Sequence, residues 1–182
     1  ATATAYLYAT AGGDLTVTGD ILVSAYAEQN APTNGSSSAY ASAYADLDAG
    51  DDIDLGGNVT VTATAINNIE SLDDSDASAF AYLYATADTG DLTVTGDILV
   101  TAYVEQTAAS ASYSGYASAY AYADLDAGGN IDLNGDVTVT ATAINNMYNS
   151  SGSATAYAYL YATAGGDLTI AGNTLVTADA TF

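Results

Sequence analysis

The chain has 182 residues, of which 22 are acidic and none is Lys, Arg, His, Cys or Trp, so its formal charge is −22. Without basic side chains it lacks the electrostatic footprint of a nucleic-acid-binding protein and forms no side-chain salt bridge. The same composition excludes disulfides, His or Cys metal sites, and catalysis by Ser-His-Asp, Cys-His or Schiff-base lysine groups.

Hydrophobic residues make up 49% of the chain, which is too many for a disordered acidic segment, and the length suits one domain. No apolar run reaches 18 residues, so the sequence predicts no transmembrane segment. The chain starts at Ala1 without a basic leader region. We therefore expect a mature segment whose leader has been removed, or an excerpt of a longer protein.

The first 27 residues predict three β-strands, near 3–11, 15–18 and 21–27. Small or apolar residues occupy the odd positions, and Thr, Tyr, Asp and Ser occupy most even positions. Strict alternation is typical of a strand with one buried face, and β-branched residues and Tyr favour a strand over a helix. Gly12-Gly13 and Gly19-Asp20 then lie where the chain changes direction.

The pattern recurs in five units of two types. The string GDLTVTGDILV occupies 13–23 and 90–100, with a relaxed copy at 166–176, whereas 45–68 and 123–146 hold a second, more acidic version. Aligned on their corner residues, the units lie 38, 39, 39 and 37 residues apart in the order A-B-A-B-A; these residues are Asp14, Asp52, Asp91, Asn130 and Asp167. We divide the single repeat domain at about 1–38, 39–76, 77–116, 117–153 and 154–182, with polar surface loops at 28–38, 66–78, 105–115 and 144–153.

One extra residue in the third unit favours a coil over one long strand. The segment 87–91 is one residue longer than 11–14, and it moves the apolar positions from odd to even. Inside a strand this slip would turn every later side chain to the wrong face, whereas at a corner it is harmless. Tight hairpins at Gly19-Asp20 and Asn134-Gly135 are the alternative, but they would place Thr18 opposite Ile21. We expect an all-β parallel β-solenoid (β-helix) of about five three-stranded rungs, with an antiparallel meander as the alternative.

Equivalent residues of a solenoid stack about 4.8 Å apart, so the alignment predicts columns of side chains. The first is a glycine column, which indicates an inward corner or a positive φ angle. Its members are Gly19, Gly57, Gly96, Gly135 and Gly172. The second is an outward tyrosine ladder, which we interpret as a stacking and assembly surface. Its members are Tyr6, Tyr44, Tyr82, Tyr122 and Tyr159.

Other columns alternate Tyr or Thr in the A units with Asp in the B units. Their carboxylates recur every second rung, about 9.6 Å apart, which limits repulsion. The corner carboxylates would still meet on adjacent rungs, where protonation or solvent cations must neutralise them. Ca²⁺ suits clustered oxygen ligands, although 46–58 and 124–136 fit neither the EF-hand nor the nonapeptide pattern. Calcium sites and a solvated acidic face remain alternatives. The candidate Ca²⁺ ligands are Asp46, Asp48, Asp51, Asp52, Asp54, Asp124, Asp126, Asn130, Asp132 and Asp136.

The strings GGDLTVTGDILV at 12–23 and GGNIDLNGDVTVTATA at 128–143 resemble the haemagglutinin-type repeats of the filamentous haemagglutinin family. That resemblance covers most of the five units. It implies a long right-handed parallel β-helix exported to the bacterial cell surface, with an adhesive role.

We expect a non-enzymatic protein, because no carboxylate pair of the glycosidase kind stands out from the repeat. The favoured hypothesis is an extracellular or cell-surface fibre subunit that assembles head-to-tail with copies of itself, with Ca²⁺ as the one candidate cofactor. A surface adhesin or ligand-binding module is the alternative. Ice binding by the Thr-x-Thr runs is less favoured, because the matching positions of the A units include Leu22, Tyr26, Leu99 and Tyr103.

Overall fold

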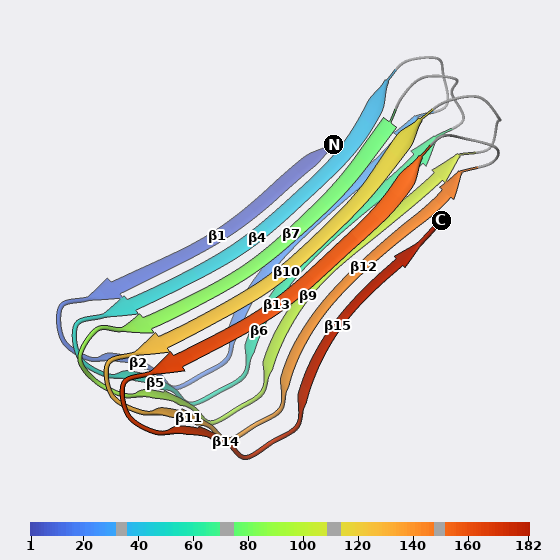
Figure 1. The fold of residues 1–182 in the computed structure, drawn as a ribbon. Coiled ribbons are helices and arrows are strands. Elements are labelled where there is room, and N and C mark those ends of the chain that lie inside the picture. Colours follow the sequence, from blue (N-terminus) through green and yellow to red (C-terminus); the bar gives the residue numbers. More distant parts are fainter. Residues whose placement is uncertain (32–35, 70–74, 109–113, 148–151) are drawn as a thin grey trace.

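The computed structural model describes residues 1–31, 36–69, 75–108, 114–147 and 152–182. Their elements are all β-strands, and these form three five-stranded parallel sheets (Figure 1). Each turn of the chain adds one strand to each sheet, so the protein is a parallel β-solenoid of five rungs. The predicted fold class is confirmed, and the antiparallel meander is excluded by the parallel pairing of every strand.

The first long sheet, sheet A, has the order β1 (Thr2–Ala11), β4 (Ser37–Ala49), β7 (Ser75–Ala87), β10 (Gly115–Ala127) and β13 (Ser153–Ala164). A short sheet, sheet B, forms the turn at one end of each rung. Its strands are β2 (Leu15–Val17), β5 (Ile53–Leu55), β8 (Leu92–Val94), β11 (Ile131–Leu133) and β14 (Leu168–Ile170). The second long sheet, sheet C, returns from it. Its strands are β3 (Ile21–Ala31), β6 (Val59–Ile69), β9 (Ile98–Ala108), β12 (Val137–Met147) and β15 (Thr174–Thr181).

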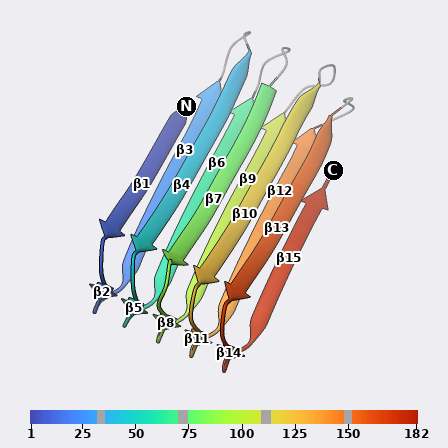
Figure 2. The ribbon, with the colours of Figure 1, turned by 60° about the vertical axis from the view of Figure 1, so that its left-hand side comes forward.

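Sheets A and C pack face to face, and sheet B closes one side between them (Figure 2). We call this side the corner end. The opposite side, where the chain passes from sheet C to the next strand of sheet A, is the connector end. Both labelled chain termini lie at the connector end (Figure 1).

The interior changes along each rung. Near sheet B it holds large aliphatic side chains such as Leu47, Ile53 and Val59, all almost fully buried. Towards the connector end both sheets turn alanine inward, for example Ala41 on β4 and Ala65 on β6, each 0% exposed. The core therefore consists of large aliphatic side chains near sheet B and mainly of alanine further along each rung.

The register confirms that the extra residue of the third unit is absorbed at a corner. Before it Ala49 pairs with Ala87, and after it Ile53 pairs with Leu92, so both flanking sheets keep inward and outward faces aligned. The predicted strand starts are also confirmed. The predicted loop starts at 28, 66, 105 and 144 are wrong, because the strands of sheet C continue for about four residues beyond them.

The reason for this error is a set of inward-pointing polar residues. Asn67 and Gln106 are 0% exposed, and Asn145 is 1% exposed, yet each occupies an inward position of a continuing strand. They keep the period of two while replacing an apolar residue by an amide. A strand prediction based on alternating hydrophobicity therefore ends each strand of sheet C too early.

Candidate functional site

The outer face of sheet A carries the tyrosine ladder that the repeat alignment predicted. Backbone pairing places Tyr6 beside Tyr44, Tyr44 beside Tyr82, and so on through Tyr122 to Tyr159. The rings of Tyr6 and Tyr44 are stacked, with centroids 4.8 Å apart and planes 5° apart. The later steps of the column are tilted contacts of 6.1, 6.2 and 6.4 Å. The column is therefore one continuous line of rings along the solenoid axis.

A second column on this face alternates as predicted, because Asp46 lies between Tyr8 and Tyr84 on the neighbouring rungs. Burial, with a smaller contribution from the nearby Asp48 carboxylate, raises the pKa of Asp46 above its ordinary value. Burial, followed by the charge of Asp46 and by neighbouring phenols, also raises the pKa of Tyr44 to about 12. Both shifts have one physical cause, which is that charge is poorly solvated between stacked rings.

The fourth rung repeats this arrangement with one additional contact. The Tyr122 hydroxyl donates a hydrogen bond of 3.0 Å to Oδ2 of Asp124. Burial, this hydrogen bond and the charge of Asp124 raise the pKa of Tyr122 to about 12. The face therefore presents phenol donors interleaved with carboxylate acceptors.

At the corner between sheets A and B, one column of Asp and Asn side chains links each rung to the next. Its members are Asp14, Asp52, Asp91, Asn130 and Asp167. In each step the Oδ1 atom of one corner residue accepts a hydrogen bond from the backbone N–H of its equivalent on the next rung. Asp52 Oδ1 accepts from Asp91 at 2.8 Å, and Asp91 Oδ1 accepts from Asn130 at 2.6 Å. The step from Asp14 is longer, at 3.4 Å. These bonds continue the ladder at a corner where the backbone carbonyl of the same residue accepts from the preceding rung, as Asp52 O does from Leu15 N at 2.8 Å.

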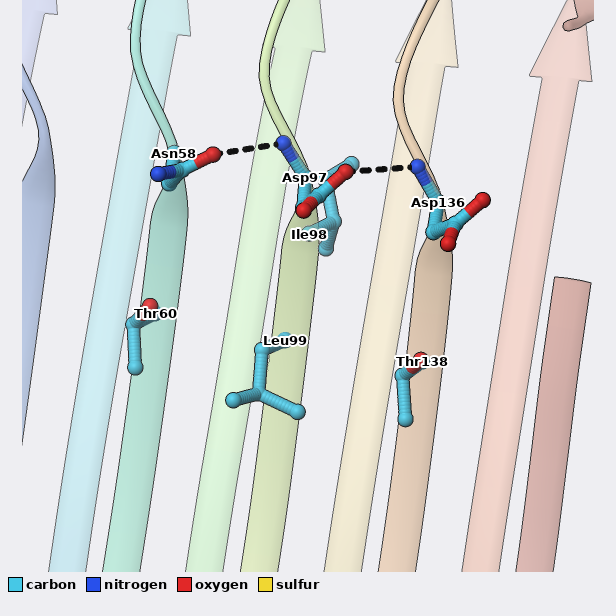
Figure 3. A pocket seen from close by; sticks show the side chains of 7 residues that line it. All are labelled: Asn58, Thr60, Asp97, Ile98, Leu99, Asp136 and Thr138. Carbon is cyan, nitrogen blue, oxygen red and sulfur yellow. Dashed lines mark hydrogen bonds between the residues drawn. The ribbon is translucent and has the colours of Figure 1, made fainter. Parts of the chain in front are cut away.

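A second column does the same at the junction of sheets B and C. Asp20, Asn58, Asp97 and Asp136 accept in turn from the next rung at 2.7, 2.8, 2.8 and 2.7 Å. Figure 3 shows the two central bonds, in which the Asp97 backbone N–H donates to Asn58 Oδ1 and the Asp136 backbone N–H donates to Asp97 Oδ1. We call the two columns the Asx ladders. The sequence revealed that corner Asp and Asn residues are adjacent but not that their side chains replace backbone acceptors.

The second Asx ladder borders a shallow groove of about 310 Å³ on the outer face of sheet C (Figure 3). Its lining residues are Asn58, Thr60, Asp97, Ile98, Leu99, Asp136 and Thr138. Leu99 stands between two threonines of neighbouring rungs, as the register requires. This alternation of Leu with Thr down the column leaves a surface of mixed polarity.

The predicted glycine column is confirmed, and its cause is close approach rather than unusual backbone. None of the described glycines has a φ in the left-handed region. A Cβ on Gly57 would lie 2.6 Å from the carbonyl carbon of Gly19, and one on Gly96 equally close to that of Gly57. A Cβ on Gly19, in the first rung of the described structure, would meet nothing within 4 Å. Each rung therefore sits on the backbone of the one before.

The candidate calcium ligands are spread over several surfaces. Asp46, Asp48, Asp124 and Asp126 lie on sheet A, and Asp54 and Asp132 lie on sheet B. Asp51, Asp52 and Asn130 lie at the corner between sheets A and B, where Asp51 Oδ1 accepts from the Thr89 hydroxyl at 3.1 Å. Asp136 lies at the next corner, between sheets B and C. Among the residues that the structure describes, no three acidic groups gather in a way that could hold a metal ion. Calcium binding stays a prediction.

At the connector end, inward amides link the two long sheets. Nδ2 of Asn67 donates to the backbone carbonyls of Ser37 and Asp76, both at 3.1 Å, while its Oδ1 accepts from the Ser37 hydroxyl. Nε2 of Gln106 donates to the carbonyl of Ser75 at 2.7 Å. These bonds cross the interior from sheet C to sheet A, and we call the residues the amide clasp.

The clasp is incomplete in the third and fourth rungs. In the third rung, the buried Oε1 of Gln106 has no hydrogen-bond partner in the structure. Asn145 donates to the carbonyls of Gly115 and Ser153, but its buried Oδ1 has no hydrogen-bond partner in the structure. Gly115 occupies the place of Ser37, and a Cβ there would lie 2.5 Å from Nε2 of Gln106. Glycine at this position thus lacks the hydroxyl that Asn67 uses in the second rung.

The fold and its columns define the chain as a parallel β-solenoid with in-register side-chain ladders. A scan of protein-family models found no match, and searches of curated proteins and of solved structures also found none. Among the described residues no helix is long and apolar enough to cross a membrane.

Proposed function

We propose that the chain is a non-enzymatic structural subunit of an extracellular filament that grows by end-to-end stacking of its rungs. The support is the chemistry of the two outermost rungs. Strands β1, β2 and β3 form one edge of the three sheets, and β13, β14 and β15 form the other. Unpaired edges of parallel sheets are templates for further strands.

The two outermost rungs are both of type A, so their tyrosine and leucine side chains would meet if two copies stacked end to end. A second copy placed with its fifth rung against the first would bring Tyr159 onto Tyr6 and Leu175 onto Leu22. Leu22 is 71% exposed and Leu175 is 54% exposed, so stacking would cover apolar surface at both. No carboxylate of the B units enters this junction.

The Asx ladders fit the same junction. Asp167 and Asn173 are the last members of the two ladders, where their backbone N–H groups donate to Asn130 and Asp136 of the preceding rung. By the repeat of the ladder, their own side-chain oxygens would accept from a following rung. The backbone N–H groups of Asp14 and Asp20 stand at the other end. Joining these donors and acceptors fixes the direction and register of stacking. Because the contact is head-to-tail and does not close into a ring, it produces a filament.

The charge of −22 on every subunit sets the conditions for assembly. Copies repel one another at low ionic strength, and salt screens this repulsion within about 10 Å at 0.1 M. We expect filaments to form more readily as salt is added. The likeness to filamentous haemagglutinin repeats supports a location at the cell surface and a fibrous role.

Substitutions at Gly12 and Gly19 test the proposal without disturbing the isolated chain. A Cβ at either position meets nothing within 4 Å of its own chain. At the equivalent internal positions, a Cβ on Gly50 or Gly57 would lie 2.6 Å from the backbone of the previous rung. The double variant Gly12→Ala/Gly19→Ala should therefore fold normally but fail to accept the fifth rung of another copy.

Electron microscopy and sedimentation at increasing salt give the measurement, with circular dichroism and melting temperature as the check of fold. The double variant Thr16→Ala/Thr18→Ala is the matched control, because both side chains point outward beside the same corners and should leave assembly intact. Filaments of Gly12→Ala/Gly19→Ala equal to those of the unmodified chain would contradict the stacking geometry. Monodisperse short rods of the unmodified chain at every salt concentration would refute the filament.

A further inference from the structure

The rings on sheet A form a connected network and not only a column. Besides the central ladder, Tyr84 contacts Tyr44 at 5.3 Å and Tyr122 at 5.4 Å. Tyr122 also contacts Tyr161 at 5.6 Å. Strands β1, β4, β7, β10 and β13 lie side by side along the axis (Figure 2), so this network crosses all five rungs of the solenoid.

The third rung offers two parallel crossings. One passes from Tyr44 through Tyr82 to Tyr122, and the other passes from Tyr44 through Tyr84 to Tyr122. The neighbouring column also crosses this rung, but there the ring belongs to Phe80, which has no hydroxyl. Every route made only of phenols must therefore use Tyr82 or Tyr84.

The composition makes these phenols the main oxidisable groups of the chain. There is no Cys or Trp, and the single Met, Met147, lies at the connector end of β12 on the other long sheet. A phenol loses its proton when it is oxidised by one electron, so an adjacent base assists the step. Asp124 is such a base, since its Oδ2 already accepts the Tyr122 proton at 3.0 Å.

We propose that the tyrosine network of sheet A carries a one-electron oxidation along the solenoid axis. A one-electron oxidant removes an electron from a phenol of one rung, and the phenol proton passes to water or to a carboxylate such as Asp124. The resulting tyrosyl radical takes an electron from the neighbouring tyrosine and a proton from solvent, while that neighbour loses its own proton. The net result is one reduced oxidant, one released proton, and a radical displaced by one rung.

This activity belongs to a single chain and does not depend on filament formation. The path from Tyr6 to Tyr159 spans four rung spacings, about 19 Å at the usual strand separation. In a filament the same network would continue through Tyr159 and Tyr6 of the next copy. Failure of stacking would leave radical transfer within one chain intact, and failure of radical transfer would leave stacking intact.

The test starts the oxidation at one end and locates it at the other. Thr4→Cys provides a unique thiol on the outer face of β1, two residues from Tyr6, for attaching a ruthenium polypyridyl photo-oxidant. Flash oxidation with a cobalt(III) ammine as the electron acceptor generates the oxidant, and a nitroso spin trap captures tyrosyl radicals. Mass spectrometry after cleavage at Asp residues then gives the adduct yield on Tyr159 and Tyr161.

The expected result is non-additive. Tyr82→Leu and Tyr84→Leu should each retain adducts on the fifth rung, because one crossing remains, whereas the double variant should confine adducts to the first two rungs. The matched control is Tyr26→Leu/Tyr103→Leu, which removes two tyrosines from sheet C and should change nothing. Circular dichroism confirms that each variant folds.

Two control samples separate transfer along the chain from transfer between molecules and from loss of access to the fifth rung. An isotopically heavy chain without the ruthenium label, mixed into each sample, reports transfer between molecules. Free ruthenium complex in solution should oxidise the fifth rung equally in all variants, which shows that its tyrosines remain accessible. The proposal is overturned if the double variant keeps the fifth-rung yield of the unmodified chain, or if the unmodified chain shows adducts only near the label.

Discussion

The two ends of each rung are held together in different directions. At the corner end the bonds run along the axis, from the Oδ1 atom of one Asx residue to the backbone of the next rung, as between Asp52 and Asp91. At the connector end they run across the interior, from Asn67 on sheet C to Ser37 on sheet A. The corner end also holds the large aliphatic core, while the connector end is lined by alanine.

This difference shows how a chain without a basic side chain closes a thin solenoid. At the corner, in-register stacking lets an Asp or Asn side chain replace a backbone acceptor. The carboxylates therefore stay at the surface and still accept hydrogen bonds between rungs. At the connector end, alanine provides little apolar area, and burial alone stabilises it weakly. Neutral amides with defined partners then hold the two sheets together.

The largest effect is expected from removing the close approach at the corner. Gly96→Ala would place a Cβ 2.6 Å from the carbonyl carbon of Gly57 and should cost about 3 kcal/mol of unfolding free energy. Gly19→Ala is the same substitution in the first rung of the described structure, where a Cβ meets nothing within 4 Å, and should change stability by less than about 1 kcal/mol. Urea unfolding of both variants measures the difference, and equal losses would show that stacking contact is not the cause.

The next largest effect should come from the amide clasp. Asn67→Ala removes three partly buried hydrogen bonds and takes the side-chain donor from the carbonyls of Ser37 and Asp76, so we expect a loss of about 2 kcal/mol. Asn145→Ala also removes an acceptor that already lacks a partner, and its cost should be about 1 kcal/mol smaller. Thermal or urea unfolding would contradict this interpretation if Asn145→Ala proved the more damaging change.

A smaller effect separates hydrogen bonding from charge in the Asx ladder. Asp91→Ala deletes the acceptor for the Asn130 backbone N–H and should cost about 1 kcal/mol. Asp91→Asn keeps an Oδ1 acceptor and removes one negative charge, as the chain itself does at Asn130, so it should cost nothing. If the alanine and asparagine variants lost stability equally, the carboxylate charge would be the essential property.

The smallest effect on stability is expected at Asp46, which lies on β4 between the corner end and the connector end. Its pKa is raised in the folded protein, so the protonated form is favoured there, and its contribution to stability is lost as the pH rises through that pKa. Asp46→Asn should therefore stabilise the chain at pH 7, by about 0.5 kcal/mol or less, because the side chain is only partly buried. The gain should vanish below the unfolded pKa of Asp, about 3.9, and unfolding curves at both pH values measure it.

The sequence was sufficient for features that depend on repetition. The period of two, the two unit types and the extra residue near Gly90 together predicted a parallel solenoid, its three strands per rung and its columns. The sequence did not predict features that depend on which atom a side chain hydrogen-bonds in the folded structure. Polarity at Gln106 suggested a loop, because only the folded interior shows the Ser75 carbonyl it reaches. Likewise, adjacency of Asp52 and Asp91 suggested repulsion, because a hydrogen bond to the next backbone N–H has no signature in composition.

The in-register pairing of each rung with its immediate neighbours also has a consequence for how the molecule forms. Every new rung closes a loop of nearly constant length, since the units are 38, 39, 39 and 37 residues apart. The entropic cost of adding a rung is therefore the same at the second turn and at the fifth, and it does not grow with the total length of the array. A completed rung exposes the strand edges with which the next rung pairs, so folding can proceed from the amino end as the chain is synthesised. A chain of this kind can therefore gain or lose repeat units without a change in its folding mechanism.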